Sequence, residues 1–548
     1  MSMDREPRPL LRGYGPLACL IVAFALMAAF VPTDAPQRVT VASTGAGVTG
    51  GTAGVATGGG GGGNGSAGTA GSTHSTTTSG TAGTSGSDTA QPRARSSGCK
   101  GPQVTGDPYS PPCVRFSGNN GGATTRGVTG NTITIAFRNT SDPGFEQTLA
   151  QIGGAQFSDT PADIERTIKG LADYFNRNFQ FYGRKIKFVF YKGQGSVTNE
   201  LLGGGQQNAS DDALKVATGI KAFGDMSAVT EPYGDALARN HVVSFGEPYL
   251  SAQWFQARAP YAWSIATDCT SVSEASAHIA VNQLDGKPAI FAGPAMSHTK
   301  RKIAIIAPDN PWYQQCVANA MRIFKAAGDP TPENIPYQLD LSTLSSQAAS
   351  VVSKLKADGI TSVACGCDPI FPVYLTQRAR QQNYYPEWHV IGVALTDQDI
   401  VGQLFDQSEW AHAVGVTYLG RTIPYQATLG YAAYRSVRHD EPAQAVNIIY
   451  AQMYMLALGI QLAGPHLTPL NFEHGMRSYP GGTGEFGTWG FPPTHFTPTL
   501  DGAEIYWDPN KISAYNGRKG AYVFSSRRHL IGNWPKGNFP HHPYKGNQ

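Results

Sequence analysis

Cysteine is the residue type whose spacing first suggests chemistry in this chain, because thiols bind metals or form disulfides. The sequence has seven cysteines, and Cys365 and Cys367 form a C-x-C pair. A thiolate metal site needs further ligands, and the sequence has neither a second C-x-C nor a histidine pair near this one. We therefore predict no metal site, and in an exported chain we expect disulfides among these two, Cys269 and Cys316. Three pairings of the four cysteines are possible.

A glycine motif near the C-terminus is the other candidate for chemistry. Gly482, Gly484 and Gly487 match the G-x-G-x-x-G spacing of dinucleotide-binding loops. Such a loop must connect a strand to a helix, but this one follows Tyr479-Pro480 and lacks both elements. The sequence also has no G-x-S-x-G, H-E-x-x-H or Gly-Lys-Ser/Thr loop. We predict that the protein is not an enzyme and has no cofactor; a hydrolase, motivated only by acids and hydroxyls in loops, is the third hypothesis.

Length and charge limit the remaining classes of function. The chain has 548 residues, which is enough for two or three domains with hydrophobic cores. Its formal net charge is +3, and only 15% of its residues are charged. Because no basic run dominates the sequence, we predict no nucleic-acid partner.

The first 39 residues have the order of an export signal or a membrane anchor. Arg5, Arg8 and Arg12 precede an apolar run from Leu17 to Val31. The run is short for a membrane-spanning helix, yet no convincing small-x-small cleavage site follows it. We therefore lean towards an anchor, and expect the protein to contact the membrane through this segment only. The rest of the chain would be extracytoplasmic, either membrane-anchored or secreted.

A linker and a short cysteine-containing segment follow. Residues 40–97 are mostly Gly, Ser, Thr and Ala, so they cannot bury enough apolar surface to fold and are predicted to be disordered. A Gly-rich coil of this length spans roughly 40 Å. In residues 98–130, Cys99 and Cys113 are expected to pair with each other. Their bridge would close a loop and stabilise a collar by about 3 kcal/mol.

The clearest structural pattern occupies residues 301–328. Residues 302–306 are an apolar run typical of a strand that is covered on both faces. Asp309 or Asn310 can cap the following helix, and Pro311 suits its first turn. The loop at the carboxyl end of such a strand is where parallel sheets bind ligands.

Strands and helices alternate in this way on both sides of that unit. Alternation of this kind predicts parallel α/β sheets with right-handed crossovers. We expect two Rossmann-like lobes joined by crossing strands, with a ligand cleft between them. The residues 410–418 read as an extended crossing segment, and the C-terminal portion carries one clear strand, Ala521–Phe524. The expected boundaries are 131–262 with 411–493 for lobe 1, 263–410 for lobe 2, and 494–548 for a C-terminal extension.

The chain resembles the type 1 periplasmic binding proteins, in particular the leucine/isoleucine/valine-binding branch of ABC transporter substrate-binding proteins. The stretches that carry the resemblance are TITIAF, FYGRKIKFVFY, VVSFGEP, KIAIIAPDNPWYQQC and LKADGITSVACGCDP. It covers roughly residues 131–462. The resemblance implies two lobes that close over a small polar molecule, an amino acid, an amide or similar, and deliver it to an ABC transporter permease.

The resemblance also implies where the ligand contacts lie, in loops at the carboxyl ends of strands. Helix N-termini in these loops would bind a carboxylate. One departure concerns the acid that pairs with a ligand ammonium group, because residues 392–395 read Gly-Val-Ala-Leu and no acid follows until Asp397. Either Glu231, Glu247, Asp368 or Asp397 takes that role, or the ligand lacks an ammonium group. The predicted ligand-binding residues are Thr230, Glu231, Ser244, Gly246, Glu247, Tyr313, Asp368 and Phe371.

Each of these positions also has a purely structural interpretation. Tyr313 could simply pack where a helix starts, while Asp368 and Glu247 precede prolines and are good turn residues. For the four later cysteines we expect both bridges to lie within lobe 2. The leading hypothesis is a solute-binding protein, and the alternative is an extracellular ligand-sensing or protein-interaction module that reuses the fold, with the Tyr/Trp/Gly-rich C-terminal portion as a contact surface.

Overall fold

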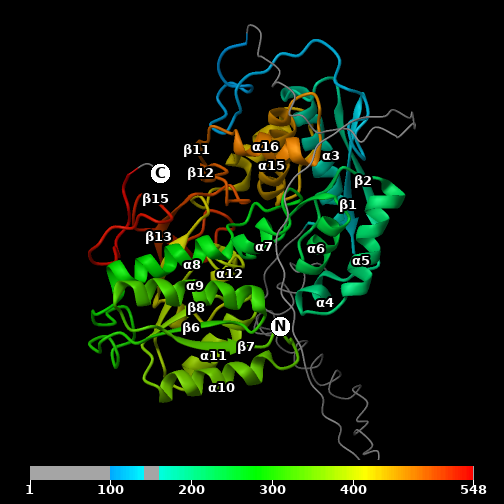
Figure 1. The fold of residues 1–548 in the computed structure, drawn as a ribbon. Coiled ribbons are helices and arrows are strands. Elements are labelled where there is room, and N and C mark those ends of the chain that lie inside the picture. The colour runs from blue at the N-terminus through cyan, green and yellow to red at the C-terminus, as the bar shows by residue number, and fades with distance from the viewer. Residues whose placement is uncertain (1–98, 141–158, 547–548) are drawn as a thin grey trace, which may run out of the picture. The chain divides into compact units, whose positions relative to one another are not determined.

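The computed structural model describes residues 99–140 and 159–546. The chain divides into two units, Met1–Asp88 and Thr89–Gln548, and all described residues belong to the second. The predicted export segment and the whole of the predicted linker lie outside the described residues. Two α/β lobes, one on a parallel sheet and one on a mainly parallel sheet, make up most of the second unit (Figure 1), so the predicted α/β fold class is confirmed.

The first lobe is built on a five-stranded parallel sheet in the order β2-β1-β3-β4-β5. Its strands are β1 (Thr132–Asn139), β2 (Lys185–Lys192), β3 (Gly224–Asp225), β4 (Val243–Phe245) and β5 (Ala262–Trp263). Its helices are α3 (Pro161–Asn178), α4 (Val197–Leu201), α5 (Gln206–Leu214), the π-helix η2 (Lys215–Ile220), α6 (Glu231–Arg239), α7 (Ala252–Gln256), the 3-10 helix η4 (Tyr425–Ala427), α14 (Leu429–Arg435), α15 (Val446–Ala463) and α16 (Pro469–Arg477).

The second lobe has a larger sheet in the order β14-β13-β10-β9-β8-β6-β7, with β15 paired to β13. Its strands are β6 (Ile303–Pro308), β7 (Glu333–Tyr337), β8 (Ser362–Cys365), β9 (Glu387–Val390), β10 (Ala413–Thr417), β13 (Asp501–Ile512), β14 (Lys519–Phe524) and β15 (His529–Leu530). Its helices are α8 (Cys269–Ile279), the π-helix η3 (Ala280–Leu284), α9 (Pro311–Ala327), α10 (Leu344–Ala357), α11 (Phe371–Gln381), α12 (Asp399–Gly402) and α13 (Gln407–Trp410). A small separate sheet pairs β11 (Gly482–Gly484) with β12 (Gly487–Trp489).

The unit around β6 and α9 shows why this sequence folds as it does. Side chains alternate along β6, so that Ile303 and Ile305 pack with α8 and α9 while Ala304 and Ile306 pack with α10 and α11. Figure 1 shows these two helix pairs on opposite sides of the sheet. The Asn310 side chain accepts a hydrogen bond from the backbone N–H of Trp312 and caps α9. The predicted strand, cap and helix are thus confirmed.

The C-terminal portion differs most from the expectation. Strand β10, which falls in the segment expected to cross back to the first lobe, instead pairs with β9 in parallel and with β13 antiparallel. Strands β13 and β14 then extend the second sheet. Of β13 and β14, the sequence indicated only part of β14 as a strand. The pairing of β10 with β13 joins segments about 90 residues apart, and such pairing leaves no local pattern. The aromatic side chains of Trp507, Trp534 and Phe539 are buried there rather than displayed.

Helix α15 is the one helix among the described residues that is long and apolar enough to cross a membrane. About 67% of its most apolar window is buried inside the protein. Met455, Leu456 and Leu458 have no exposed surface and belong to the core of the first lobe. Since it also packs against α3, α14 and α16, we interpret α15 as the central helix of this lobe.

Three disulfides are present in the described residues. Cys99 pairs with Cys113, as expected for the collar. Of the three possible pairings of the other four cysteines, the structure has Cys269–Cys316 and Cys365–Cys367. The first of these joins α8 to α9 and the second lies at the carboxyl end of β8, so both are within lobe 2.

Candidate functional site

Tyr313, in the first turn of α9, lies where the two lobes meet. It is half-buried. Burial raises the pKa of its phenol to about 12, and the charges of Asp368 and Glu231 add to this rise. Glu231 opens α6 in the first lobe, whereas Asp368 follows β8 in the second. The charges of two predicted residues, one from each lobe, thus act on the phenol of a third, Tyr313.

Glu231 is held by aromatic and cationic neighbours of its own lobe. Its Oε1 accepts a hydrogen bond of 3.0 Å from the indole Nε1 of Trp254, and lies 3.8 Å from the guanidinium of Arg258. That guanidinium also lies 4.0 Å above the Trp254 ring and is paired with Asp235. Burial raises the pKa of Glu231, and the hydrogen bond from Trp254 opposes the rise.

Asp368 is committed to the start of α11. Its Oδ1 accepts hydrogen bonds from the backbone N–H groups of Ile370 and Phe371, at 2.8 and 3.1 Å. Its Oδ2 accepts a hydrogen bond of 2.5 Å from the hydroxyl of Tyr337. Burial nevertheless raises the pKa of Asp368. Phe371 has no exposed surface and stacks on Tyr337 with a 4.0 Å separation of ring centroids, which places it in the core of lobe 2.

Thr230 and Ser244 are completely buried, and each donates its hydroxyl to a carboxylate. Thr230 donates to Glu200, and Ser244 donates to Oε1 of Glu247. Glu247 is also completely buried, and burial raises its pKa to about 8. Among the described residues its Oε2 has no hydrogen-bond partner. Gly246 has a φ of +131°, a conformation open to glycine, and its backbone N–H donates to the carbonyl of Trp263.

Sequence reasoning missed Tyr249, Ala394 and Leu395. Tyr249 follows β4 in the first lobe; burial raises the pKa of its phenol, and the backbone N–H groups of Leu395 and Ala394, in the loop after β9, oppose the rise. All three are non-glycine residues with φ between +51° and +61°. Such strained conformations cluster at functional sites, but no residue type or motif announces them. We call Glu231, Tyr249, Tyr313 and Asp368 the interlobe site.

Asp397, the first acid after the position where the resemblance implies one, is not a free carboxylate. It is 7% exposed and accepts the hydroxyl hydrogen bond of Thr417 at 2.5 Å. Burial raises its pKa to about 6. Its charge contributes to the raised pKa of Tyr249.

A buried arginine at the carboxyl end of β1 was also missed. Arg138 is 4% exposed and forms two 2.9 Å hydrogen bonds with the carboxylate of Glu200 and one of 3.3 Å with Asp212. Its guanidinium lies 3.6 Å above the ring of Tyr233. Because these partners come from different helices, no sequence spacing could indicate them. The pairing leaves the cation committed to protein carboxylates.

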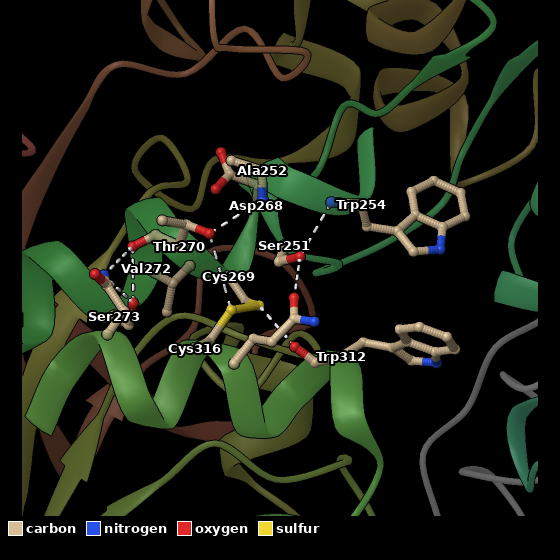
Figure 2. Close-up of a disulfide and its surroundings, with 12 residues drawn as sticks. Ser251, Ala252, Trp254, Asp268, Cys269, Thr270, Val272, Ser273, Trp312 and Cys316 are labelled. Carbon is tan, nitrogen blue, oxygen red and sulfur yellow. Dashed lines mark hydrogen bonds between the residues drawn. A yellow bond between two sulfur atoms is a disulfide. The ribbon is translucent and has the colours of Figure 1, made fainter. Parts of the chain in front are cut away.

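The disulfide Cys269–Cys316 fixes the neighbourhood of the interlobe site. Ser251, in the loop after β4, donates a 2.9 Å hydrogen bond to Gln315 of α9. Figure 2 shows Trp254 and Trp312 projecting to the same side of this disulfide. Although Trp312 belongs to α9, it packs against the hydrophobic core of the first lobe. The start of α9 is therefore in contact with both lobes.

Two cavities occur away from the interlobe site. A cavity of about 650 Å³ is lined by α8, η3, the C-terminal half of α9 and Lys536. A smaller one of about 40 Å³ lies in the apolar layer between α8 and β6. None of the eight predicted ligand-binding residues lines either of them. In the part of the chain that the structure describes, no group of three or more His, Cys, Asp or Glu side chains could hold a metal ion.

Comparisons with known proteins identify the family and the fold of the chain. A family model described as periplasmic binding protein matches residues 153–503. A solute binding protein of an ABC transporter from R. palustris, in complex with 4-hydroxybenzoate, is similar in fold with a TM-score of 0.50 and 11% identity, over 71% of this chain and 95% of that one. A solute binding protein of an ABC transporter from Rhodopseudomonas palustris HaA2, in complex with p-hydroxybenzoic acid, is also similar in fold. Its TM-score is 0.50 and its sequence identity 12%, over 72% of this chain and 98% of that one. No curated protein matches the sequence.

Proposed function

Because the chain belongs to the periplasmic binding protein family, whose members are solute-binding proteins and not enzymes, we propose that it captures a small polar molecule at the interlobe site. The solute is of the amino acid or amide class, and the protein delivers it to the permease of an ABC importer. The observation that carries this proposal is the contact of the start of α9 with both lobes, where Trp312 packs against the first-lobe core and Ser251 donates to Gln315.

The chemistry of the interlobe site suits a small solute. Its side chains combine aromatic surface with hydrogen-bonding groups, which is the composition of ligand sites in general. Glu231, Tyr313 and Asp368 are only half-buried, and among the described residues no hydrogen bond is formed by the hydroxyl of Tyr313. A solute held there would contact both lobes at once, and its binding energy would favour their closed arrangement.

The family implies an extracytoplasmic location. We further propose that the N-terminal apolar segment anchors the protein to the membrane and that the Gly-rich linker tethers the binding lobes to it. Restricted to the membrane surface, the protein would present its solute close to the permease.

A thermal-shift screen of the oxidised full chain tests the proposal. The panel contains amino acids, amides, ureas, short carboxylates and aromatic acids. A solute at a hundredfold its dissociation constant adds about 2.7 kcal/mol to the free energy of unfolding and raises the melting temperature. Tyr313→Ala should remove the shift, while Lys354→Ala on the exposed face of α10 should retain it. A blank across the panel would overturn the proposal and favour the alternative of a sensing or protein-interaction module.

A further inference from the structure

We propose that the protein has a second binding site, apart from the interlobe site, for a short zwitterionic peptide of about three residues. The site is the cavity of about 650 Å³ that is lined by α8, η3, the C-terminal half of α9 and Lys536. We call it the lateral cavity. The inference goes beyond the proposed function and does not depend on it, because no residue of the interlobe site lines the lateral cavity.

The way in which α8 and α9 are joined explains why there is room between them. Near their starts the two helices are linked by the disulfide Cys269–Cys316 (Figure 2), and the amide of Asn319 donates a 2.9 Å hydrogen bond to the hydroxyl of Ser273. Further along α9, small side chains such as Ala326 line the cavity. The helices are therefore held together at their first turns, and a hollow lies between their later turns.

The third wall of the lateral cavity is the C-terminal segment of the chain, which Figure 1 shows in red beside α8. The side-chain amide of Asn282, in η3, donates a 2.9 Å hydrogen bond to the carbonyl of Trp534. The N–H of Gly537 donates to the carbonyl of Asn282 at 3.2 Å. These bonds hold Lys536 beside the cavity. Because the family model matches only as far as residue 503, this wall lies outside the matched part of the chain.

The lateral cavity is lined by charged side chains of both signs. They are two acids and two cations, Glu274, Asp329, Arg322 and Lys536. Among the described residues, none of the four forms an ion pair. Since their formal charges cancel, the cavity attracts neither a simple anion nor a simple cation. A ligand that carries one group of each sign is attracted through both.

The two charged residues at the α9 side set the length and direction of that ligand. Arg322 and Asp329 are seven residues apart, or about 10 Å along the helix axis. Asp329 follows the C-terminal end of α9, where the helix dipole is negative and favours an ammonium group. A carboxylate is then placed towards Arg322. Three extended residues span about 10 Å, whereas a single amino acid carries both groups on one carbon and cannot reach both side chains.

The surface between these charges suits a peptide backbone with small side chains. His278 lines the cavity from α8 and is half-buried. Its Nδ1 is enclosed and has no hydrogen-bond partner among the described residues, which leaves Nε2 as the nitrogen for a peptide N–H or carbonyl. Ile323 and Ala326 add apolar surface. The volume also lies within the range of small-molecule sites, roughly 300–1,000 Å³.

The lateral cavity and the interlobe site lie towards opposite ends of α9. Tyr313 is in the first turn of the helix and Ala326 in the last, which separates them by about 20 Å along its axis. A peptide in the lateral cavity therefore does not occupy the place of a solute at the interlobe site.

Calorimetric titration of the oxidised full chain tests the inference with four related compounds. Trialanine carries both charges, N-acetyl-trialanine lacks the ammonium group, trialanine amide lacks the carboxylate, and alanine has both charges on one carbon. We expect trialanine to bind about fivefold more tightly than either derivative, a ratio suited to a half-exposed ion pair. Alanine should bind more weakly than trialanine by a similar factor.

Two variants assign each end of the peptide to a side chain. Asp329→Asn should weaken trialanine binding by about fivefold and leave N-acetyl-trialanine unchanged. Arg322→Gln should weaken trialanine binding by about the same factor and leave trialanine amide unchanged. Lys325→Gln is the matched control, since Lys325 is exposed on α9 and does not line the cavity. It should bind all four compounds as the unmodified protein does.

The outcomes separate this inference from the proposed function. The inference is wrong if trialanine does not bind at about 10 mM, or if either derivative or alanine binds as tightly as trialanine. Trialanine binding that is lost in Tyr313→Ala and kept in Arg322→Gln would also overturn it, and would place the peptide at the interlobe site. A blank in the solute screen leaves the inference standing, and absence of trialanine binding leaves the proposed function standing.

Discussion

Glu247 provides a sharp test of the electrostatics beneath the interlobe site. The side chain is completely buried, and a single hydroxyl, that of Ser244, donates to its carboxylate. Its carboxyl group packs so closely on α6 that a Cβ at Gly234 would approach its Oε1 to 2.5 Å. The carboxylate cannot be hydrated there, so the protonated form is favoured and the pKa rises to about 8 from the ordinary value of 4.5.

The raised pKa has a definite sign for stability. Between pH 4.5 and 8 the folded protein keeps the Glu247 proton, while the unfolded chain releases it. The unfolded state then binds fewer protons, so the free energy of unfolding falls as pH rises, by about 1.4 kcal/mol per pH unit. Glu247→Gln keeps the shape of the side chain and removes this titration. The stability of the variant relative to the unmodified protein should therefore rise by about 2.5 kcal/mol between pH 5 and pH 7.

Urea unfolding followed by circular dichroism at pH 5, 6, 7 and 8 measures this difference. Glu441→Gln is the matched control, because the Glu441 side chain is 58% exposed, and its effect should not depend on pH in this range. A stability difference for Glu247→Gln that is the same at pH 5 and pH 7 would show that Glu247 is ionised in the folded protein, and would refute the reasoning.

Three further predictions concern the framework around the site. Replacing Cys269 and Cys316 by Ala opens a loop with a sequence separation of 47 and should lower the free energy of unfolding, measured with denaturant, by about 4 kcal/mol. The same change at Cys365 and Cys367, which are separated by 2, should lower it far less. Equal losses would contradict the loop-entropy argument. Arg301→Met removes the cation paired with buried Glu387 and should lower the free energy of unfolding by about 3–5 kcal/mol. Lys354→Ala, which removes an exposed ion pair, is the control and should change it little. Similar effects of the two variants would contradict the argument that a buried unpaired charge is costly. Asp368→Ala removes the hydrogen-bond acceptor at the start of α11 and should lower the free energy of unfolding by about 1–2 kcal/mol. Asp368→Asn keeps an acceptor oxygen and should restore this stability. If it does not, the lost charge matters more than the cap.

Local patterns predicted much of the fold. The apolar run and the caps around β6 and α9 were visible in the sequence because each depends on residues a few positions apart. Strands β10 and β13 did not reveal their pairing, since the register of Val414 with Tyr506 depends on a contact between distant parts of the chain. A sequence shows that a segment can be a strand, but does not show which sheet it joins.

The candidate site was predictable only in part. Glu231, Tyr313 and Asp368 follow strand ends, and the charges of the two acids act on the phenol of Tyr313. Tyr249 and Leu395 could not be inferred, because a left-handed backbone at a bulky residue leaves no compositional signal. The occupation of the helix N-termini by Asn310 and Asp368 also emerged only from their hydrogen bonds, although both residue types are good caps.

Hydrogen exchange with and without a solute identified in the screen tests the central claim most directly, because it can locate binding on the chain. The account predicts protection in both lobes together, in the loop from Gly246 to Leu250, at the start of α9, and in the loop from Ala394 to Asp397. Protection confined to α8, the C-terminal half of α9 and the segment around Lys536 would place the solute in the 650 Å³ cavity instead. That result would contradict binding at the interlobe site.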